Sequence, residues 1–363
     1  MIISFLKERI EAFQPYHTDK GMTYEDGLML LTALRFYDYT GDDFYLDFLR
    51  RYLEFHIDAE GNITNYRLED YNIDNILAGN VLFFMEDRTG DRRYGLAAAR
   101  LRKQLEGQLR TGSGNFWHKL RYPNQIWLDG LYMGQLFYLA YGYRHGESTV
   151  PADVMNQVEN VRRFLWDGAR RLYVHAYDES RKMPWADPKT GRSPNVWLRS
   201  VGWFAMALVD LAALFENRDD AAKARLGVLL EELLVGMMPH RDPQTAMWFQ
   251  IVDRPDVVGN YLETSGSAML AYAMYKGVRI GILDRGYANQ ADLTLQGMEK
   301  RYLRHDISGY VLGGTCAVAG LDDQRRNGSV EYYLSERIAE NEIKGVAPYF
   351  FSYYEKFQMN RKT

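Results

Sequence analysis

Two kinds of helical segment alternate along the chain, and this alternation limits the possible folds more than any other feature of the sequence. One kind is amphipathic and carries charges along one face, at residues 2–13, 43–57, 91–108, 153–165, 219–236 and 287–303. The other kind is apolar and aromatic on nearly every side, at residues 24–39, 71–86, 127–143, 197–215, 261–280 and 342–356. A helix that is apolar all round is normally buried, whereas an amphipathic helix covers a core with one face. The sequence therefore predicts six helical hairpins, each with one outer and one inner helix.

Six hairpins of this kind form an all-α fold when they close into a ring, the (α/α)6 toroid, with six inner and six outer helices. No Pro/Gly/Ser-rich linker divides the 363 residues. A single hydrophobic core usually stops growing at about 250–300 residues, but a ring of hairpins extends around an axis instead. We expect one (α/α)6-barrel catalytic domain over residues 1–363.

The connections between the helices differ in length according to their direction. An inner helix passes to the next outer helix through a tight turn, as in "TGDD" at 40–43 and "RTGD" at 88–91. The opposite connections are long, at residues 58–70, 109–126, 166–196, 237–260 and 304–330. Function concentrates on long loops, and all of these would lie where the inner helices begin. Converging helix N-termini favour an anion, so we expect a small acidic ligand at this mouth.

Composition excludes several classes of partner. The net charge is -4 with no basic stripe, so no nucleic acid is expected. No apolar run approaches the roughly 20 residues of a membrane span, and the first residues, "MIISFLKERIEAF", lack the features of a signal peptide. We therefore expect no membrane partner and a cytoplasmic location. Aromatic residues reach 14%, which fits stacking on sugar rings as well as it fits a tyrosine-rich core.

A metal centre is not expected either. Cys316 is the single cysteine, which excludes a disulfide within the chain and argues against a cysteine-based zinc site. Five histidines outside the motifs discussed below show no metal-ligand spacing: His17, His56, His145, His240 and His305. We expect no metal and no cofactor.

Charged residues open four of the inner helices: Asp74, Asp129, Arg199 and Glu263. Any one of them alone is explained as a partner of the helix dipole or as half of a buried ion pair. Asp74 and Asp129, however, open neighbouring hairpins, and Arg199 opens the next one. Paired carboxyl groups are the recurring equipment for acid/base chemistry on sugars, so we predict that these residues line one pocket.

Several longer motifs resemble those of the unsaturated rhamnogalacturonyl hydrolases of glycoside hydrolase family 105. The resemblance spans nearly the whole chain, and its motifs include "YNIDNILAGN" around Asp74, "FWHK" from 116, "IWLDGLYM" from 126, "VWLRSVGWFAMAL" from 196, "NYLETSGSAM" from 260 and "NEIKGVAPYFF" from 341. The related unsaturated glucuronyl hydrolases share the toroid and the aspartate pair, but they are less similar in "HK" and "WLRSVGW". No single short motif is decisive, whereas the ordered set is specific.

The resemblance implies an enzyme that acts after a polysaccharide lyase. Such hydrolases remove the 4,5-unsaturated uronic acid, here of galacturonyl type, from the non-reducing end of oligosaccharides of rhamnogalacturonan, a pectin component, by hydrating the C4=C5 double bond. It implies Asp129 as the acid/base and Asp74 as the assisting carboxylate. The matching substrate-binding positions are His118, Lys119, His175, Arg199 and Trp203, with Tyr24 and Trp248 as further candidates.

Other functions remain open at this point. An unsaturated glucuronyl hydrolase would act on fragments of glycosaminoglycan, ulvan or arabinogalactan. An inverting glycosidase on the same toroid would cleave saturated oligosaccharides with Asp74 and Asp129. A toroidal epimerase would rely on histidine bases, which the starts of the inner helices do not supply. A toroidal binding or scaffold protein would need no carboxyl pair.

Overall fold

The computed structural model of the protein describes residues 1–13 and 21–361, and the predicted alternation of helices is present in it. The outer helices are α1 (Ile2–Ala12), α3 (Asp43–His56), α5 (Arg92–Gly107), α7 (Val150–Leu165), α9 (Asp220–Met237) and α11 (Gly286–Tyr302). The inner helices are α2 (Tyr24–Thr40), η2 (Ile73–Val81) continued by α4 (Leu82–Thr89), α6 (Leu128–His145), α8 (Leu198–Phe215), α10 (Thr264–Arg279) and α13 (Ile343–Arg361).

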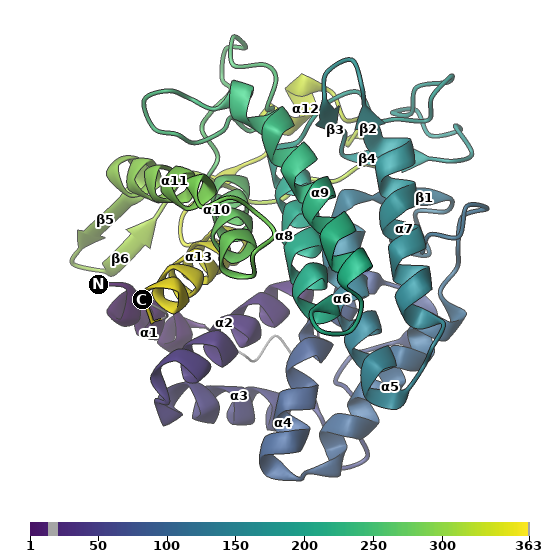
Figure 1. Ribbon diagram of the computed structural model, residues 1–363, viewed down its shortest axis with the longest axis vertical. Coiled ribbons are helices and arrows are strands. Elements are labelled where there is room, and N and C mark those ends of the chain that lie inside the picture. The colour runs from purple at the N-terminus through teal and green to yellow at the C-terminus, as the bar shows by residue number, and fades with distance from the viewer. Residues whose placement is uncertain (14–20, 362–363) are drawn as a thin grey trace.

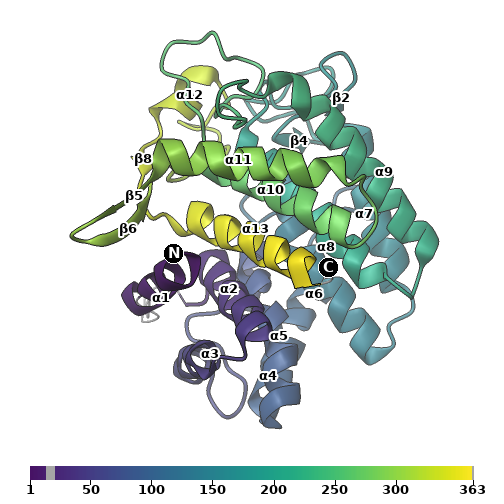
Figure 2. The same ribbon diagram turned by 60° about the vertical axis from the view of Figure 1, so that its left-hand side comes forward.

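The inner helices close into a ring. Each contacts the next along the chain, and the last inner helix, α13, contacts the first, α2. The outer helices cover this ring from outside, because each packs on an inner helix, as α3 does on α2 and α11 does on α10 (Figure 1). Figure 2 shows α10, α11 and α13 side by side at one part of the ring. The prediction of an (α/α)6 toroid is confirmed.

Glycine and aspartate define the tight turns between inner and outer helices. Gly41 ends α2 with a left-handed φ of 67°, and Asp42 then accepts a hydrogen bond from the N–H of Phe44 to cap α3. Gly90 and Asp91 repeat the same arrangement between α4 and α5. Glycine adopts the left-handed region without a steric penalty, and aspartate is among the best N-cap residues. The short sequence "TGD" thus reverses the chain direction at this end of the ring.

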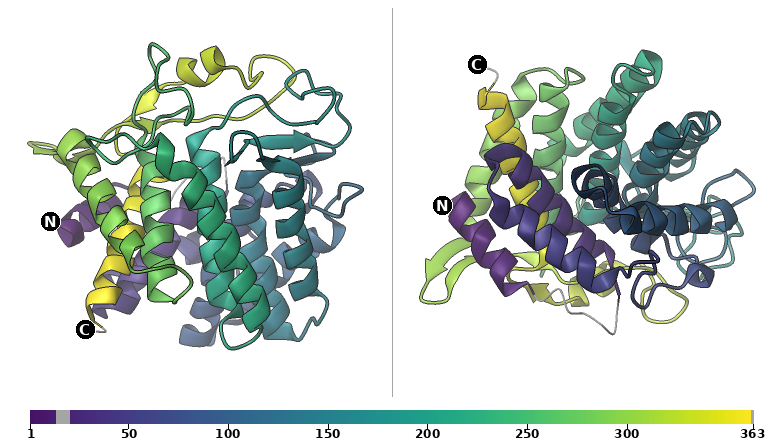
Figure 3. Two further views of the ribbon diagram at one scale, coloured as in Figure 1. Left: turned by 45° about the horizontal axis from the view of Figure 1, so that its top comes forward. Right: turned by 90° about the horizontal axis from the view of Figure 1, so that it is seen from below.

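The long loops gather at the opposite end of the ring, as the left panel of Figure 3 shows. They contain two further 3-10 turns, η1 (Leu68–Asp70) and η3 (Met238–His240), and the short helix α12 (Val330–Ser335). Within the described residues, four antiparallel strand pairs brace them: β1 (Gln125–Trp127) with β4 (Ala176–Asp178), β2 (Trp166–Asp167) with β3 (Leu172–Tyr173), β5 (Leu303–Asp306) with β6 (Gly309–Leu312), and β7 (Thr315–Cys316) with β8 (Ile338–Ala339).

The second inner helix differs from the prediction. Residues 71–86 were expected to form one α-helix, but residues Ile73–Val81 adopt the tighter 3-10 winding and α4 follows from Leu82. The two helix types differ in hydrogen-bond register, and over two turns they place apolar residues at similar spacings. The spacing of side chains therefore could not distinguish them.

Helix α8 is long and apolar enough to cross a membrane by length and composition, but 89% of it is buried inside the ring. It contacts α6, α9 and α10. Its apolar surface is thus accounted for by packing against other helices of the same chain.

Candidate active site

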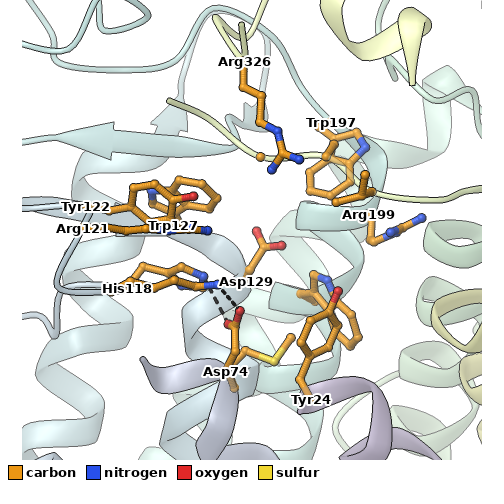
Figure 4. Close-up of a pocket in the computed structure, with 16 residues that line it drawn as sticks. Tyr24, Asp74, His118, Arg121, Tyr122, Trp127, Asp129, Trp197, Arg199 and Arg326 are labelled. Carbon is orange, nitrogen blue, oxygen red and sulfur yellow. Dashed lines mark ion pairs between the residues drawn. The ribbon is translucent and has the colours of Figure 1, made fainter. Parts of the chain in front are cut away.

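A cavity of about 310 Å³ lies among the starts of the inner helices and the long loops (Figure 4). Its lining includes seven of the nine residues predicted for the site: Tyr24, Asp74, His118, Lys119, Asp129, Arg199 and Trp203. Concave sites of this size, with a few converging polar groups, are typical of small-molecule binding. The predicted mouth of the ring is thus a real cavity, although the roles of its residues stay predictions.

Asp74 is held by two basic side chains from the loop before β1. Lys119 Nζ lies 2.5 Å from its Oδ2 atom, and His118 Nε2 lies 3.2 Å from its Oδ1 atom. Burial by itself would raise the pKa of Asp74, but the neighbouring Lys119 and His118 outweigh it and hold this pKa well below its usual range. Asp74 is therefore a carboxylate at any working pH.

Asp129 lies in the first turn of α6 and has a different environment. Its Oδ2 atom is buried and accepts no hydrogen bond from the described residues. The nearest basic group is His175, whose Nε2 atom lies 3.5 Å from Oδ2. Pairing of β1 with β4 brings this histidine here, because Trp127 is opposite Ala176 and the Leu128 N–H donates to the His175 carbonyl. Asp129 thus faces the cavity with a histidine behind it.

Tyr333 of α12 contacts the ring nitrogen of His175 that does not face Asp129. Its hydroxyl lies 2.7 Å from His175 Nδ1, and burial raises the pKa of this hydroxyl well above its ordinary value. This hydroxyl either donates to Nδ1 or accepts from a protonated Nδ1, depending on the tautomer of the imidazole. When the hydroxyl donates, the proton of the neutral imidazole is on Nε2, the nitrogen that faces Asp129.

Arg199, in the first turn of α8, is anchored to α10 and the loop beyond it. Its Nε donates to Ser265 Oγ at 2.8 Å, and Nη2 donates to the Cys316 carbonyl and lies 3.5 Å from Glu263 Oε1. Glu263 is itself held by the Gly266 and Cys316 N–H groups, at 2.8 and 3.0 Å. The guanidinium is therefore a fixed part of the cavity wall with a carboxylate behind it.

Two groups of aromatic rings form opposite walls. On one side Trp203 stacks on Tyr132 with ring centroids 5.2 Å apart, and Tyr24 meets Trp203 edge-on at 6.3 Å. On the other side Trp127 stacks on both His118 and Tyr122, with ring centroids 4.8 Å apart in each pair. Flat, rigid faces of this kind suit a sugar ring.

Two predicted residues do not line the cavity. His175 is fully buried behind Asp129, so it contacts a catalytic candidate rather than the substrate. Trp248 belongs to the hydrophobic core, where its Nε1 donates to the Met237 carbonyl at 2.8 Å. The structure does not support substrate contact by Trp248, because the core surrounds its ring. His17 lies outside the described residues, and within them no three His, Cys, Asp or Glu side chains gather as metal ligands.

Sequence reasoning missed nine lining residues, of which five are aromatic or charged: Arg121, Tyr122, Trp127, Trp197 and Arg326. Trp127 and Trp197 are the aromatic residues that open "WLDGLYM" and "WLRSVGW", a repeated signal that pointed to them. The other three come from long loops, where no periodic pattern marks the residues that turn inward.

Comparison with known proteins gives consistent matches over the chain. The sequence profile of Glycosyl Hydrolase Family 88 matches residues 4–360. Protein Atu3128 of Agrobacterium fabrum is 40% identical over 238 residues, which are 63% of this chain and 100% of that protein. The unsaturated rhamnogalacturonyl hydrolase YesR of Bacillus subtilis is 25% identical over 265 residues, 71% of this chain and 72% of that one.

Solved structures agree with these matches. A family 105 glycoside hydrolase from C. acetobutylicum superposes with a TM-score of 0.92 at 36% identity, covering 98% of this chain and 99% of that chain. The unsaturated glucuronyl hydrolase of Bacillus sp. GL1 has the same fold, with a TM-score of 0.69 at 15% identity and coverage of 99% and 96%. The chain therefore belongs to glycoside hydrolase family 105, a family of enzymes related to the family 88 unsaturated glucuronyl hydrolases.

Proposed function

We propose that this enzyme removes the 4,5-unsaturated galacturonyl residue from the non-reducing end of lyase-generated rhamnogalacturonan oligosaccharides. Membership of family 105 supports an unsaturated uronyl substrate. The name of the Bacillus subtilis relative supports the galacturonyl type and the rhamnogalacturonan source. A cavity of about 310 Å³ with aromatic walls supports action on the end of a chain, since it has room for a terminal residue.

The contrast between the two carboxyl groups carries the mechanistic part of this proposal. Asp74 is tied to Lys119 and His118 and stays ionised, so it is unsuited to deliver a proton. Asp129 has an Oδ2 atom without a hydrogen bond from the described residues and faces the same cavity. Proton transfer requires a group that can hold and release a proton, and Asp129 is the carboxyl that meets this requirement.

The reaction would proceed by hydration of the double bond. Protonated Asp129 delivers its proton to C4, and water adds to C5 while its surplus proton returns to the Asp129 carboxylate. The product is a hemiketal at C5, whose ring C5–O bond then opens to a ketone. Opening leaves C1 as a hemiacetal, which releases the leaving sugar as an alcohol. Asp74, as a fixed anion beside Lys119, would orient the water or a sugar hydroxyl.

Asp129→Asn tests this assignment. The amide nearly matches the carboxyl in shape but neither donates nor accepts the proton, so turnover should fall by about 10⁴ or more, the upper end of the effect of a lost acid/base. The measurement is the loss of ultraviolet absorbance of the conjugated double bond in an unsaturated galacturonyl-rhamnose disaccharide. Asp70→Asn, an exposed aspartate outside the cavity, is the control. A variant that keeps more than about a tenth of the wild-type rate would show that another carboxyl is the acid/base.

Three disaccharides separate the proposed substrate from its rivals. Wild-type enzyme should cleave the unsaturated galacturonyl-rhamnose disaccharide fastest, an unsaturated glucuronyl disaccharide more slowly, and a saturated galacturonyl disaccharide not at all. Faster cleavage of the glucuronyl compound would show that the unsaturated glucuronyl residue is the preferred substrate, with the proposed hydration chemistry unchanged. Cleavage of the saturated compound would instead indicate attack at the anomeric carbon.

A further inference from the structure

More cationic than acidic side chains line the cavity. Two are carboxylates and four are cations: Asp74, Asp129, Lys119, Arg121, Arg199 and Arg326. Two of these cations already have a carboxylate partner, since Lys119 pairs with Asp74 and Arg199 with Glu263. Arg121 and Arg326 form no ion pair with any residue in the described ranges. The cavity therefore contains two cations without an ion-pair partner among the described residues.

The two unpaired arginines lie at the rim of the cavity, while the paired groups lie deeper. Arg199 and Asp74 are 2% and 9% exposed, whereas Arg121 is exposed and Arg326 is partly exposed. In Figure 4, Arg326 reaches in from the side opposite Asp74. A substrate that enters end-first would place its terminal ring at the floor and the remainder of the chain beside these arginines.

Both arginines are oriented by their surroundings. The Arg121 guanidinium lies over the Tyr122 ring, 4.8 Å from its centroid, and Tyr122 stacks on Trp127. Arg326 ends a loop closed by Asp322, whose carboxylate accepts from the Arg326 N–H at 2.8 Å and whose own N–H donates to the Arg326 carbonyl at 2.9 Å. A Cβ atom added at Gly320 would lie 3.0 Å from Arg326 Nη1, so the guanidinium rests directly on this glycine.

We propose that Arg121 and Arg326 form a second anion site, which binds a carboxylate or sulfate group on the leaving part of the substrate. The proposal rests on the proposed function, because only an enzyme that takes the terminal uronate into the cavity places the leaving part at the rim. A guanidinium forms paired hydrogen bonds to either kind of anion. The preferred substrates are then oligosaccharides that carry a further acidic group close to the scissile linkage, in addition to the unsaturated uronate.

Three unsaturated substrates test the site: the galacturonyl-rhamnose disaccharide, the same disaccharide sulfated on rhamnose, and a tetrasaccharide whose third residue is a galacturonate. For the wild type, kcat/KM should be about tenfold higher for at least one of the two substrates with the extra anion than for the plain disaccharide, and the preferred one identifies the group that binds. This preference should shrink at about 0.5 M salt, because the arginines are near solvent.

The variants are Arg326→Gln, Arg121→Gln, the double variant and Arg326→Lys. Each Gln variant should lower the preference, the double variant should abolish it, and Arg326→Lys should keep part of it because the charge remains. Arg301→Gln is the matched control, since Arg301 is also exposed over a tyrosine ring but lies outside the cavity, and it should leave the preference unchanged. Thermal unfolding confirms that each variant is folded.

Two results would overturn the inference, and they differ. If the plain disaccharide is cleaved but neither extra anion raises kcat/KM, or if the double variant keeps the preference, the second site does not exist. If the wild type cleaves none of the three substrates, the proposed function is wrong and the second site is wrong with it.

Discussion

Asp74 and Asp129 show how neighbouring side chains assign different tasks to two identical carboxyl groups. Both begin inner segments and both face one cavity, but Asp74 is paired with Lys119 and Asp129 is backed by His175. In sugar-cleaving enzymes, two carboxyl groups take different acid and base roles because their environments give them different pKa values. The chemistry of the site is therefore decided by residues that do not react.

Asp74→Asn should lower turnover by about 10- to 100-fold, which is less than the effect of Asp129→Asn. The variant would orient the water or the sugar hydroxyl less well, but it would keep the proton donor. The substitution removes a negative charge and leaves Lys119 in place, which stabilises any remaining carboxylate in the cavity. Since the acid/base must be protonated to act on C4, the alkaline limb of the rate profile should move to lower pH. The measurement is kcat/KM against pH, with Asp74→Glu as the variant that restores the charge. An unmoved limb would show that the two carboxyl groups are not coupled.

The pKa of Asp74 also predicts a pH dependence of stability. It is lowered in the folded protein, whereas the unfolded value is about 3.9. The contribution of the ionised carboxylate to folding is therefore fully present above about pH 4 and is lost as the pH falls below this value toward the folded pKa. Urea unfolding of the wild type and of Asp74→Asn should show a difference in free energy of unfolding that shrinks as the pH falls below about pH 4. A difference in free energy of unfolding that does not change with pH would contradict an ionised Asp74 paired with Lys119.

Tyr333→Phe tests the orientation of His175. Losing one hydrogen bond of about 0.5–1.5 kcal/mol should lower kcat roughly three- to tenfold with little change in KM, because neither residue lines the cavity. The alkaline limb should move as well, because the hydroxyl no longer contacts the imidazole beside Asp129. A purely structural role would lower thermal stability without changing this limb, so both are measured.

At the scale of elements, the starts of α8 and α10 pack in close contact within the ring. A Cβ atom at Gly266 would lie 2.4 Å from Leu198 Cγ and 2.9 Å from the Leu198 carbonyl oxygen. Gly202 meets the same helix one turn later, with Gly266 Cα at 3.2 Å from its added Cβ. Small residues allow the two backbones to approach, which brings Arg199 within reach of its anchors on α10.

Gly266→Ala should therefore destabilise the protein by about 1–3 kcal/mol, the usual cost of overpacking, because backbone as well as side chain must move. Gly134→Ala is the matched control inside another inner helix, α6, where the added Cβ would meet only Ile73 at 3.8 Å. Its expected effect is a gain of up to about 1 kcal/mol from helix propensity. Chemical denaturation measures both, and equal effects at the two glycines would contradict the close contact.

At the scale of the whole molecule, a buried polar network joins three inner helices inside the ring. Asp210 of α8 accepts hydrogen bonds from Tyr272 and Lys276 of α10, at 2.5 and 2.6 Å, and lies 3.5 Å from Arg35 of α2. These helices are distant in sequence, and the network ties them together away from the catalytic residues.

Asp210→Asn should lower the free energy of unfolding by about 3–5 kcal/mol, because Arg35 and Lys276 would be left buried without a balancing charge. The control is Asp87→Asn, which breaks a surface pair with Arg144 where the aspartate is 61% exposed, and about 1 kcal/mol or less is expected there. Thermal and urea unfolding give both values. A loss at Asp210 no larger than at Asp87 would show that the network does not bear on stability.

The sequence by itself determined the architecture and the main polar residues of the cavity. Alternating apolar and amphipathic helices, tight "TGD" turns and long opposite loops are local patterns, and they predicted the toroid and the end that carries the site. Residues at the starts of inner helices, such as Asp129 and Arg199, follow directly from the ring geometry, because all these starts converge on one mouth.

Only the tertiary structure decided what surrounds those residues. His175 lies behind Asp129 because β4 pairs with β1, and Trp248 turns into the core although it comes from a long loop like Arg326. The path of an irregular loop depends on contacts with segments far away in the chain, and no periodic pattern records them. The ionised state of Asp74 has the same origin, since Lys119 reaches it from a neighbouring hairpin rather than from its own helix.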